Sequence, residues 1–228
     1  MTDLHSHILP GMDDGAADTK EAIALLRAQQ RDGVGVVALT PHYNSYRDHF
    51  DKFLRKREKA FERLREAAKD IPVKLLLGAE VAFFEDLPNH DIEPLCITGT
   101  KAVLIEMPIA FYPSSVPEVF CSLSQKGFVP IVAHVERYPY IMHDEGLLDD
   151  LSLCGALMQI NADSLFGSVM MRKQLLDFIE SKRVHILATD AHSMKRRPPM
   201  LAKAMKLVRK RLGDDAAETL IAAPGLLV

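Results

Sequence analysis

Residues 115–134 read "SVPEVFCSLSQKGFVPIVAH", and this stretch shows the repeating unit of the chain. An amphipathic segment ends at Gly127, and a short apolar run follows it. Because glycine readily takes a left-handed conformation just past a helix, the pattern predicts a helix, a turn and then a strand. The predicted strand ends in a potential metal ligand, His134.

The same order recurs elsewhere. Gly33 precedes "VGVVALT", and Gly155 precedes "ALMQIN". Helix starts are marked as well, because two acidic or hydroxyl residues are followed three positions later by glutamate. This spacing predicts capping boxes at Asp18 with Glu21 and at Ser115 with Glu118.

Seven strands are expected, near residues 2–6, 34–40, 73–79, 101–106, 128–133, 156–161 and 184–189. Helices are expected near 18–32, 51–69, 115–126, 144–154, 170–182 and 199–212. Apolar strands that alternate with helices predict a parallel sheet covered by helices. An unbroken run of such units favours a closed or nearly closed barrel over an open sheet. No linker-like composition divides the chain, so one domain over residues 1–228 is expected.

Composition narrows the class of protein. The net charge of −3 argues against nucleic acid as the main partner, since phosphate binding usually needs a basic surface. No apolar run reaches the roughly 18 residues that span a bilayer, and no secretory signal is visible, so a cytoplasmic location without membrane insertion is expected. The mostly charged helix 51–69 is explained by a solvated outer face. The cysteines lack CxxC spacing, which favours buried free thiols at Cys96, Cys121 and Cys154.

Six of the seven expected strands end in a histidine or an acid, which the chain supplies as His5, His7, His42, Glu80, Glu106, His134, Asp190 and His192. In α/β barrels the carboxyl ends of the strands form the active-site face, so these side chains should converge. Residues i and i+2 of a strand project from one face. His5 and His7 can therefore chelate one ion, and Asp190 with His192 repeats this geometry.

All these ligands are nitrogen or oxygen donors, which excludes a thiolate zinc site and favours manganese, iron or zinc. The donors outnumber the needs of one ion, so a cluster of two or three metals is inferred. Asp14, on the loop after the first strand, is expected to complete the set, and Asp13 to form a turn or support a ligand. Asp3 is expected to be buried behind the ligands, and Asn161 is left outside the metal set.

Clustered cations activate water and clamp the oxygens of a displacement at phosphorus. Arg137 and Arg197 lie just after two of the ligand histidines, where a guanidinium could bind phosphate with two hydrogen bonds. There is no Gly-rich phosphate loop. No cysteine begins the Cys-x5-Arg loop of cysteine-dependent tyrosine phosphatases, because the sixth residue after each is Ala102, Gly127 or Ile160. Phosphatase activity would therefore rely on metal-activated water.

The motifs "DLHSHILPGMDDGA", "TPH", "GAE", "VLIEMP", "AHVERY", "TDAH" and "RRPPM" resemble the PHP (polymerase and histidinol phosphatase) superfamily, in order and over nearly the whole chain. HxH and DxH are the superfamily features. The DDG loop and the HVERY and RPP segments are similar to CpsB/CapC-type bacterial protein-tyrosine phosphatases of capsule and exopolysaccharide systems. The resemblance implies a distorted (β/α)7 TIM-like barrel with three divalent ions, usually manganese.

The resemblance also implies a role for each site residue. One ion would bind His5, His7, Glu80 and Asp190. A second would bind Glu80, Glu106 and His134, with Glu80 bridging. A third would bind Asp14, His42 and His192. Arg137 and Arg197 match the family's phosphate-binding arginines.

The expected substrate is a phosphotyrosine protein, such as the tail of a bacterial tyrosine kinase. Two alternatives stay open. One is another PHP phosphoesterase, such as a histidinol-phosphate phosphatase or a nuclease. The other is a regulatory metal-binding module without turnover. The oligomeric state is left open.

Overall fold

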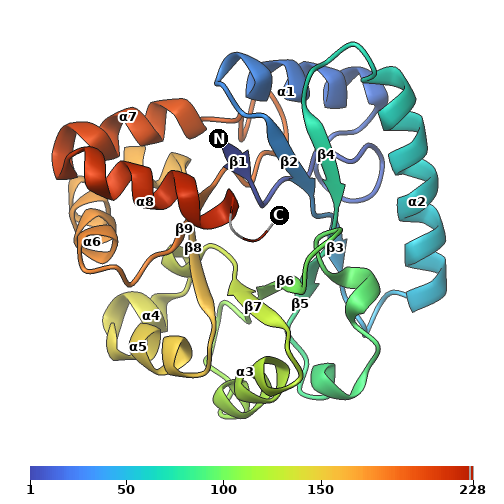
Figure 1. The fold of residues 1–228 in the computed structure, drawn as a ribbon. Helices are drawn as coiled ribbons and strands as arrows, with labels where there is room; N and C mark the ends of the chain where they lie inside the picture. Colours follow the sequence, from blue (N-terminus) through green and yellow to red (C-terminus); the bar gives the residue numbers. More distant parts are fainter. Residues whose placement is uncertain (226, 228) are drawn as a thin grey trace.

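A computed structural model describes residues 1–225 and 227. It is an α/β structure in which every named pair of neighbouring strands is parallel. The strands lie around the middle of the molecule and the helices lie outside them (Figure 1). The strands are β1 (Thr2–Asp3), β2 (Val36–Leu39), β3 (His42–Tyr43), β4 (Lys74–Leu77), β5 (Glu80–Ala82), β6 (Ala102–Glu106), β7 (Val129–Val132), β8 (Leu157–Asn161) and β9 (Ile186–Ala188).

The strands form two sheets, with the orders β1-β2-β4 and β3-β5-β6-β7-β8-β9. The chain leaves the first sheet for the second between β2 and β3 and again between β4 and β5. The backbone N–H of Asp190 donates to the carbonyl of His5 at 2.9 Å, which joins the end of β9 to the segment after β1. The seven predicted strands are all present, but a closed barrel is not found among the described residues.

All six predicted helices are present, with bounds that differ by one or two residues at most ends. They are α1 (Thr19–Arg31), α2 (Phe50–Ala67), α3 (Val116–Gln125), α5 (Gly146–Leu153), α6 (Val169–Glu180) and α7 (Leu201–Leu212). Two helices were not predicted, α4 (Pro139–His143) and α8 (Asp214–Gly225). Within the described part of the chain, no helix combines the length and the apolar character that a membrane crossing requires.

Local signals at the helix ends are mostly confirmed. Gly33, Gly127 and Gly155 have φ values of 77°, 82° and 79°, the left-handed region that favours glycine. Asp18 caps α1, because its carboxylate accepts the backbone N–H of Glu21 at 2.8 Å. The predicted capping box at the start of α3 is wrong: the Ser115 hydroxyl donates to the side chain of Glu85 and makes no capping hydrogen bond.

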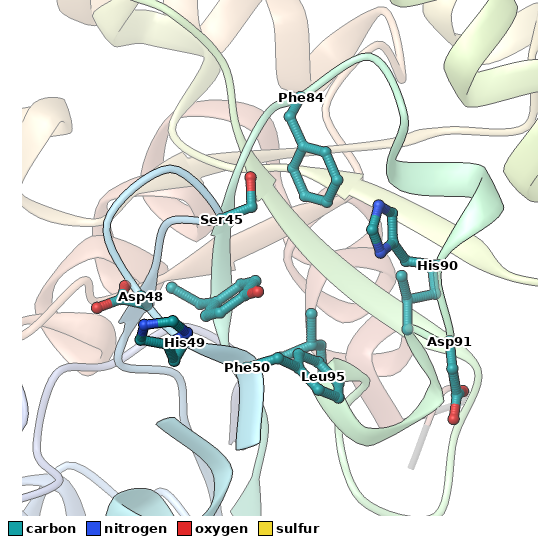
Figure 2. A pocket seen from close by; sticks show the side chains of 10 residues that line it. Ser45, Asp48, His49, Phe50, Phe84, His90, Asp91 and Leu95 are labelled. Atoms are coloured by element: carbon teal, nitrogen blue, oxygen red, sulfur yellow. The ribbon is translucent and has the colours of Figure 1, made fainter. Parts of the chain in front are cut away.

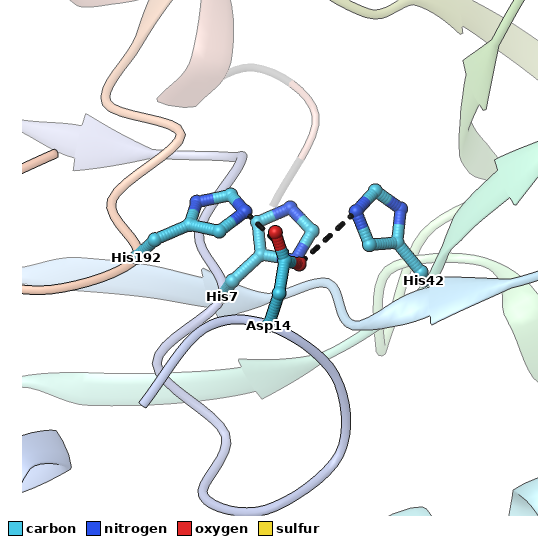
Figure 3. A group of neighbouring side chains, drawn as sticks. All are labelled: His7, Asp14, His42 and His192. Atoms are coloured by element: carbon cyan, nitrogen blue, oxygen red, sulfur yellow. Dashed lines mark ion pairs between the residues drawn. The ribbon is translucent and has the colours of Figure 1, made fainter. Parts of the chain in front are cut away.

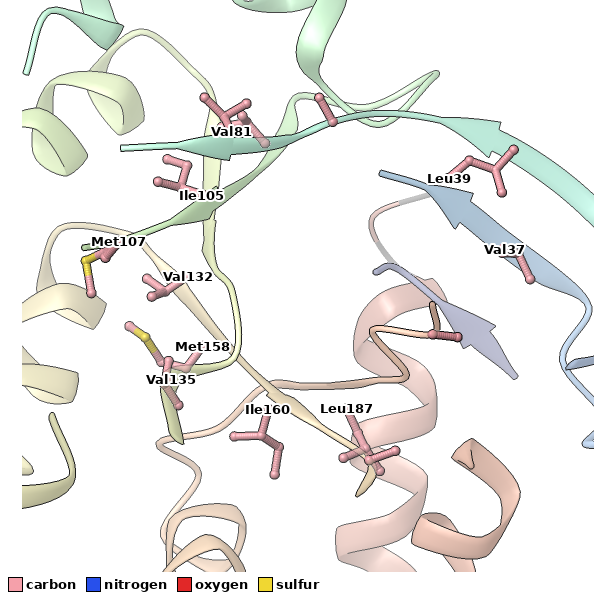
Figure 4. Packing of buried hydrophobic residues seen from close by; sticks show 14 of the residues in the cluster. Val37, Leu39, Val81, Ile105, Met107, Val132, Val135, Met158, Ile160 and Leu187 are labelled. Carbon is pink, nitrogen blue, oxygen red and sulfur yellow. The ribbon is translucent and has the colours of Figure 1, made fainter. Parts of the chain in front are cut away.

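Both faces of the strands are buried, so the core has two parts. The larger part lies between strands and helices and includes Val37, Leu39, Ile105, Val132 and Leu187 (Figure 4). The smaller part consists of the residues that alternate with these along the strands, among them Ala38, Leu104, Ile131, Ile186 and Ala188. Side chains therefore fill the space between the two sheets, which is a packed core and not a channel.

The prediction of three free thiols is wrong for two of the cysteines. Cys121 on α3 and Cys154 at the end of α5 form a disulfide, with their Cα atoms 4.4 Å apart. Their separation of 33 positions in the sequence conceals that the two helices lie side by side. Cys96 is buried and free, as predicted.

Candidate metal centre

All nine predicted ligand side chains lie together: eight are at or just beyond the carboxyl ends of β1, β2, β4, β6, β7 and β9, and Asp14 comes from the loop after β1. Eight of them fall into three overlapping groups, and the ligand atoms of each group lie within 4.8 Å of one another. The groups are His7, Asp14, His42 and His192; His5, His7 and Asp190; and His42, Glu80 and Glu106. The ninth, His134, places its Nε2 2.9 Å from Glu80 Oε1. Strands distant in sequence therefore contribute to one cluster, because parallel strands all end at the same edge.

Glu80, the first residue of β5, lies at the centre of this cluster. Its Oε2 atom is 3.3 Å from His5 Nε2, 3.1 Å from His7 Nε2 and 3.0 Å from His42 Nδ1. Yet this buried oxygen makes no hydrogen bond with any described residue. A buried carboxylate oxygen without a hydrogen bond is costly, and several imidazole nitrogens converge on it. This arrangement fits a divalent cation held between them.

A second group of donors lies nearer the surface (Figure 3). Asp14 Oδ1 lies 3.6 Å from His42 Nε2 and 3.5 Å from His192 Nε2. His192 Nε2 is buried and has no hydrogen-bond partner among the described residues. The Asp14 side chain is 68% exposed, because it projects from the loop after β1 over the other donors. The group thus has one exposed carboxylate donor from a loop and three imidazoles from the body of the fold.

The grouping differs from the expected ligand sets in two respects. His42 Nδ1 lies 3.0 Å from Glu80 and 3.8 Å from Glu106, so His42 joins both the inner carboxylates and the outer group. His7 likewise belongs to two groups, since its imidazole stacks on that of His192 with centroids 4.0 Å apart. The donors therefore form one continuous cluster rather than three separate sets.

Two of the predicted ligand residues occupy unusual backbone conformations. His134 and Asp190 have φ values of 31° and 48°, in the left-handed region that residues other than glycine rarely adopt. Ala133 faces the space between the sheets, so an extended chain would turn the next side chain outward. The left-handed conformation of His134 instead directs its imidazole towards Glu80. Such local strain is characteristic of functional sites.

The loop after β1 is held by Asp13. Its Oδ2 lies 2.8 Å from His7 Nδ1 and accepts the backbone N–H of His42 at 2.9 Å, while Oδ1 accepts that of Gly15 at 3.0 Å. Asp13 therefore orients one ligand through its imidazole and another through its backbone, as the sequence predicted for a turn or supporting residue. An acceptor on Nδ1 leaves Nε2 of His7 free to face a cation.

Supporting residues in β8 were only partly predicted. Gln159 Oε1 lies 3.0 Å from His5 Nδ1 and accepts the His134 backbone N–H at 2.8 Å. Asn161 Nδ2 donates to Asp190 Oδ2 at 2.8 Å. Sequence reasoning missed Gln159, although a glutamine inside the apolar run "ALMQIN" is a visible signal. A buried amide in a strand needs partners, and here the partners are two ligand residues.

Asp3 is fully buried behind the cluster, as predicted. Its carboxylate accepts the backbone N–H of Thr189 at 3.0 Å and also the side chains of Thr189 and Gln29. Asp3 thereby ties β1 to the residue before Asp190. It also accepts the backbone N–H of His5 at 3.4 Å and makes no hydrogen bond with the side chain of a predicted ligand among the described residues, so its effect on the cluster is positional.

The two predicted phosphate-binding arginines both reach Asp190. Arg197 Nη1 donates to Asp190 Oδ2, and Arg137 Nη1 lies 3.7 Å from the same oxygen. Both guanidinium groups remain partly exposed, at 29% and 39%. Each guanidinium has five N–H donors, so most remain available for an anion above the cluster.

The charges in the cluster are strongly coupled. Burial alone would raise the pKa of Glu80, but the surrounding imidazoles, His5 first, hold it well below its usual range. Burial lowers the pKa of His5, yet attraction to Glu80 and Asp190 outweighs it and raises the pKa to about 9. Burial and repulsion from His7 lower the pKa of His192 to about 4. The Glu80 carboxylate is therefore anionic, and a cation that binds here displaces a proton from the imidazole of His5.

Comparisons of the sequence with known proteins identify its family. The sequence profile of the family described as capsular polysaccharide synthesis, CpsB/CapC, matches residues 1–225. The tyrosine-protein phosphatase YwqE of Bacillus subtilis is 34% identical over 225 residues, which cover 94% of this chain and 86% of YwqE. The tyrosine-protein phosphatase CpsB of Streptococcus pneumoniae is 29% identical over 233 residues, which cover 96% of this chain and 94% of CpsB.

A solved structure extends the likeness to three dimensions. It comes from work on YwqE and CpsB, described there as unique metal-dependent tyrosine phosphatases. It superposes with a TM-score of 0.88 at 31% identity and covers 100% of this chain and 94% of its own. Since the family profile matches residues 1–225, and both the YwqE sequence and the solved structure are similar over almost the whole chain, this chain belongs to the CpsB/CapC family.

Proposed function

We propose that this protein is a metal-dependent protein-tyrosine phosphatase that acts on a phosphotyrosine protein, such as the tail of a bacterial tyrosine kinase of capsule or exopolysaccharide synthesis. The observation that carries the proposal is the buried Glu80 oxygen, which faces three imidazoles and makes no hydrogen bond with a described residue. The names of the relatives YwqE and CpsB support the same activity.

The proposed cofactor is a cluster of three divalent ions, with manganese favoured and iron or zinc as alternatives. The proposed ligands are His5, His7, Asp14, His42, Glu80, Glu106, His134, Asp190 and His192. The donors are all imidazole or carboxylate, the types that suit such ions. We further propose that residues 1–228 form a single domain, in which the two sheets together act as a distorted (β/α)7 barrel.

Bound divalent ions would lower the pKa of water to about 7 and neutralise phosphate charge. The chain's own contribution is positional. Arg137 and Arg197 are held beside Asp190 and present N–H groups to the phosphoryl oxygens. Asp13 and Gln159 fix the imidazoles of His7 and His5. These contacts keep the donors in place before the substrate arrives, which lowers the cost of forming the transition state.

A tyrosine leaving group makes few further demands on the chain. Its phenol has a pKa of about 10, so it departs as phenolate with little help from a general acid. Aryl phosphates should therefore react much faster than alkyl phosphates. This difference separates a tyrosine phosphatase from a histidinol-phosphate phosphatase, whose substrate is an alkyl ester.

The test begins with metal analysis of the purified protein. Hydrolysis of p-nitrophenyl phosphate should cease after treatment with chelator and return on addition of Mn²⁺. Unchanged hydrolysis after complete metal removal would contradict the proposal. Phosphotyrosine peptide, histidinol phosphate and single-stranded DNA are then assayed side by side, and the phosphopeptide should be the preferred substrate. His42→Ala and Arg137→Ala should abolish turnover while leaving the fold intact, and unchanged turnover would contradict the roles of these residues. A binding module without turnover predicts instead that the Mn²⁺-loaded wild-type protein hydrolyses none of these substrates.

A further inference from the structure

A hollow with basic lining lies directly beside the metal centre. It has a volume of about 410 Å³ and is formed by the loop after β3 and the first turns of α2. Its lining contains three cations, Arg47, Lys52 and Lys56, against one carboxylate, Asp48. His42 belongs to the lining as well as to the cluster of metal donors, so the two sites are continuous.

The loop that carries Arg47 is ordered by Asn44. The Asn44 carbonyl accepts the backbone N–H groups of Arg47 at 3.0 Å and Asp48 at 2.8 Å. The Asn44 side chain accepts the N–H of Tyr46 at 3.0 Å, and the Asp48 carboxylate accepts the N–H of Asn44 at 2.9 Å. The single acid of the hollow is thus engaged with the backbone. Arg47 is presented on a preformed turn, which reduces the entropy lost when it binds a partner.

The positive charges of Arg47 and Lys52 in the hollow are available to a ligand. Arg47 and Lys52 are exposed, and neither forms an ion pair with any residue that the structure describes. Lys56 donates to the carbonyl of Met12 at 3.1 Å, which holds it against the loop that leads to Asp13. The chain as a whole carries a net charge of −3, so this positive surface is local. It suits an anionic group that reaches the protein together with the phosphate.

A second hollow, of about 370 Å³, lies next to the first and is very different in character (Figure 2). The two share Asp48 and His49 in their linings. Aromatic and aliphatic side chains line the second hollow, among them Phe50, Phe84 and Leu95, and it contains no lysine or arginine. Recognition of an anion is therefore confined to the first hollow.

We propose that the hollow beside His42 recognises an acidic residue, aspartate or glutamate, close to the phosphotyrosine in the substrate chain. The inference rests on the proposed phosphatase function and names the class of sequence that the enzyme prefers. An extended peptide advances about 3.3–3.6 Å per residue. Because the hollow shares His42 with the metal donors, the side chain that it binds is close in sequence to the residue at the metal centre. Arg47 and Lys52 are the specificity-determining residues.

The test compares two phosphopeptides that differ only in charge, with aspartate and glutamate beside the phosphotyrosine replaced by asparagine and glutamine. The wild-type enzyme should hydrolyse the acidic peptide with roughly tenfold higher kcat/KM, mostly through KM, and added salt should shrink this ratio. The ratio should approach one in Arg47→Gln/Lys52→Gln and invert in Arg47→Glu/Lys52→Glu. The matched control Lys206→Gln/Lys210→Gln removes two exposed charges from α7, on the other side of the molecule (Figure 1), and should keep the wild-type ratio.

Binding of peptides of the same two sequences, with a non-hydrolysable phosphonate in place of the phosphate ester, is followed by fluorescein anisotropy in the presence of Mn²⁺ and reads the hollow without turnover. The inference is overturned if wild-type enzyme treats both peptides alike, or if the preference survives in Arg47→Glu/Lys52→Glu. Failure of the phosphatase proposal gives a different result: no hydrolysis of either peptide or of p-nitrophenyl phosphate. The anisotropy ratio still decides the preference in that case.

Discussion

Gly15 is the position at which the smallest change should disable the metal centre. A Cβ atom added there would lie 2.0 Å from the His7 carbonyl oxygen and 2.5 Å from His7 Cβ. Both atoms belong to or adjoin the backbone of a proposed ligand, so neither can move cheaply. Gly15→Ala should therefore push the loop of Asp13 and Asp14 away from the cluster.

The size of the effect follows from the geometry. To reach the 3.4 Å at which ordinary contact begins, the atoms must separate by about 1.4 Å beyond the 2.0 Å of the unrelaxed variant. Asp13 would then lose its contacts with His7 Nδ1, now 2.8 Å, and the His42 N–H, now 2.9 Å. Hydrogen bonds to a charged group contribute about 1.5–3 kcal/mol each. A misplacement of about 1 Å in an active site costs about 100-fold in rate.

We therefore expect kcat for p-nitrophenyl phosphate to fall by about 100-fold in Gly15→Ala, together with weaker binding of Mn²⁺ by titration calorimetry. Gly35→Ala is the matched control, because no atom lies within 4 Å of its added Cβ and its φ is not positive. Should Gly15→Ala fail to fold, Asp13→Asn tests the same loop, with an expected loss of about tenfold in metal affinity. Wild-type activity and metal content in both variants would refute the reasoning.

Three further variants test other parts of the structure. Arg197→Lys should lower kcat/KM for a phosphotyrosine peptide by about 10–100-fold, since an ammonium cannot contact Asp190 and phosphate as a planar fork does; an equal kcat/KM would contradict the role. Tyr138→Phe should cost about 1–3 kcal/mol in urea titrations, because the buried N–H of Met107 loses its acceptor at 2.9 Å, and no loss would exclude this contribution. Burial lowers the pKa of His185 below 6.5, so the unfolded chain takes up this proton first on acidification and stability falls below about pH 6.5. His185→Gln should lessen the fall between about pH 7.5 and 5.5, and an unchanged fall would contradict it.

The positions of the ligands were predictable because two simple rules apply to them. Parallel strands end at one edge, and side chains two apart share a face, so a histidine or an acid at each strand end could be placed without coordinates. The break into two sheets was not predictable in this way. β2 and β4 each continue into a second short strand, β3 and β5, after only two residues. The sequence pattern of one long strand and of two short ones is the same.

Contacts between side chains that are distant in the sequence could not be predicted either. Gln159 supports His5 and His134, and Cys121 meets Cys154. The glutamine stands out within its apolar run, but the local sequence does not identify the partners of either residue. The charged helix 51–69 illustrates the same point. One stripe of α2 is buried and most of its other side chains are exposed, as a solvated face predicts. Only the fold reveals that Lys52 and Lys56 lie beside His42.

Asp190 explains why the metal donors and the arginines form one site. Its Oδ1 lies 3.4 Å from the Nε2 atoms of both His5 and His7, while its Oδ2 accepts hydrogen bonds from Asn161 and Arg197. One oxygen of this buried carboxylate thus faces the proposed cation, and the other faces Arg197, the proposed phosphate-binding residue. Its φ of 48° is the conformation in which it does so. The Asp190 side chain positions both the proposed cation and the Arg197 guanidinium, so a substrate phosphate bound by Arg197 would also lie over the metal donors. A change at Asp190 should therefore affect metal binding and phosphate binding together.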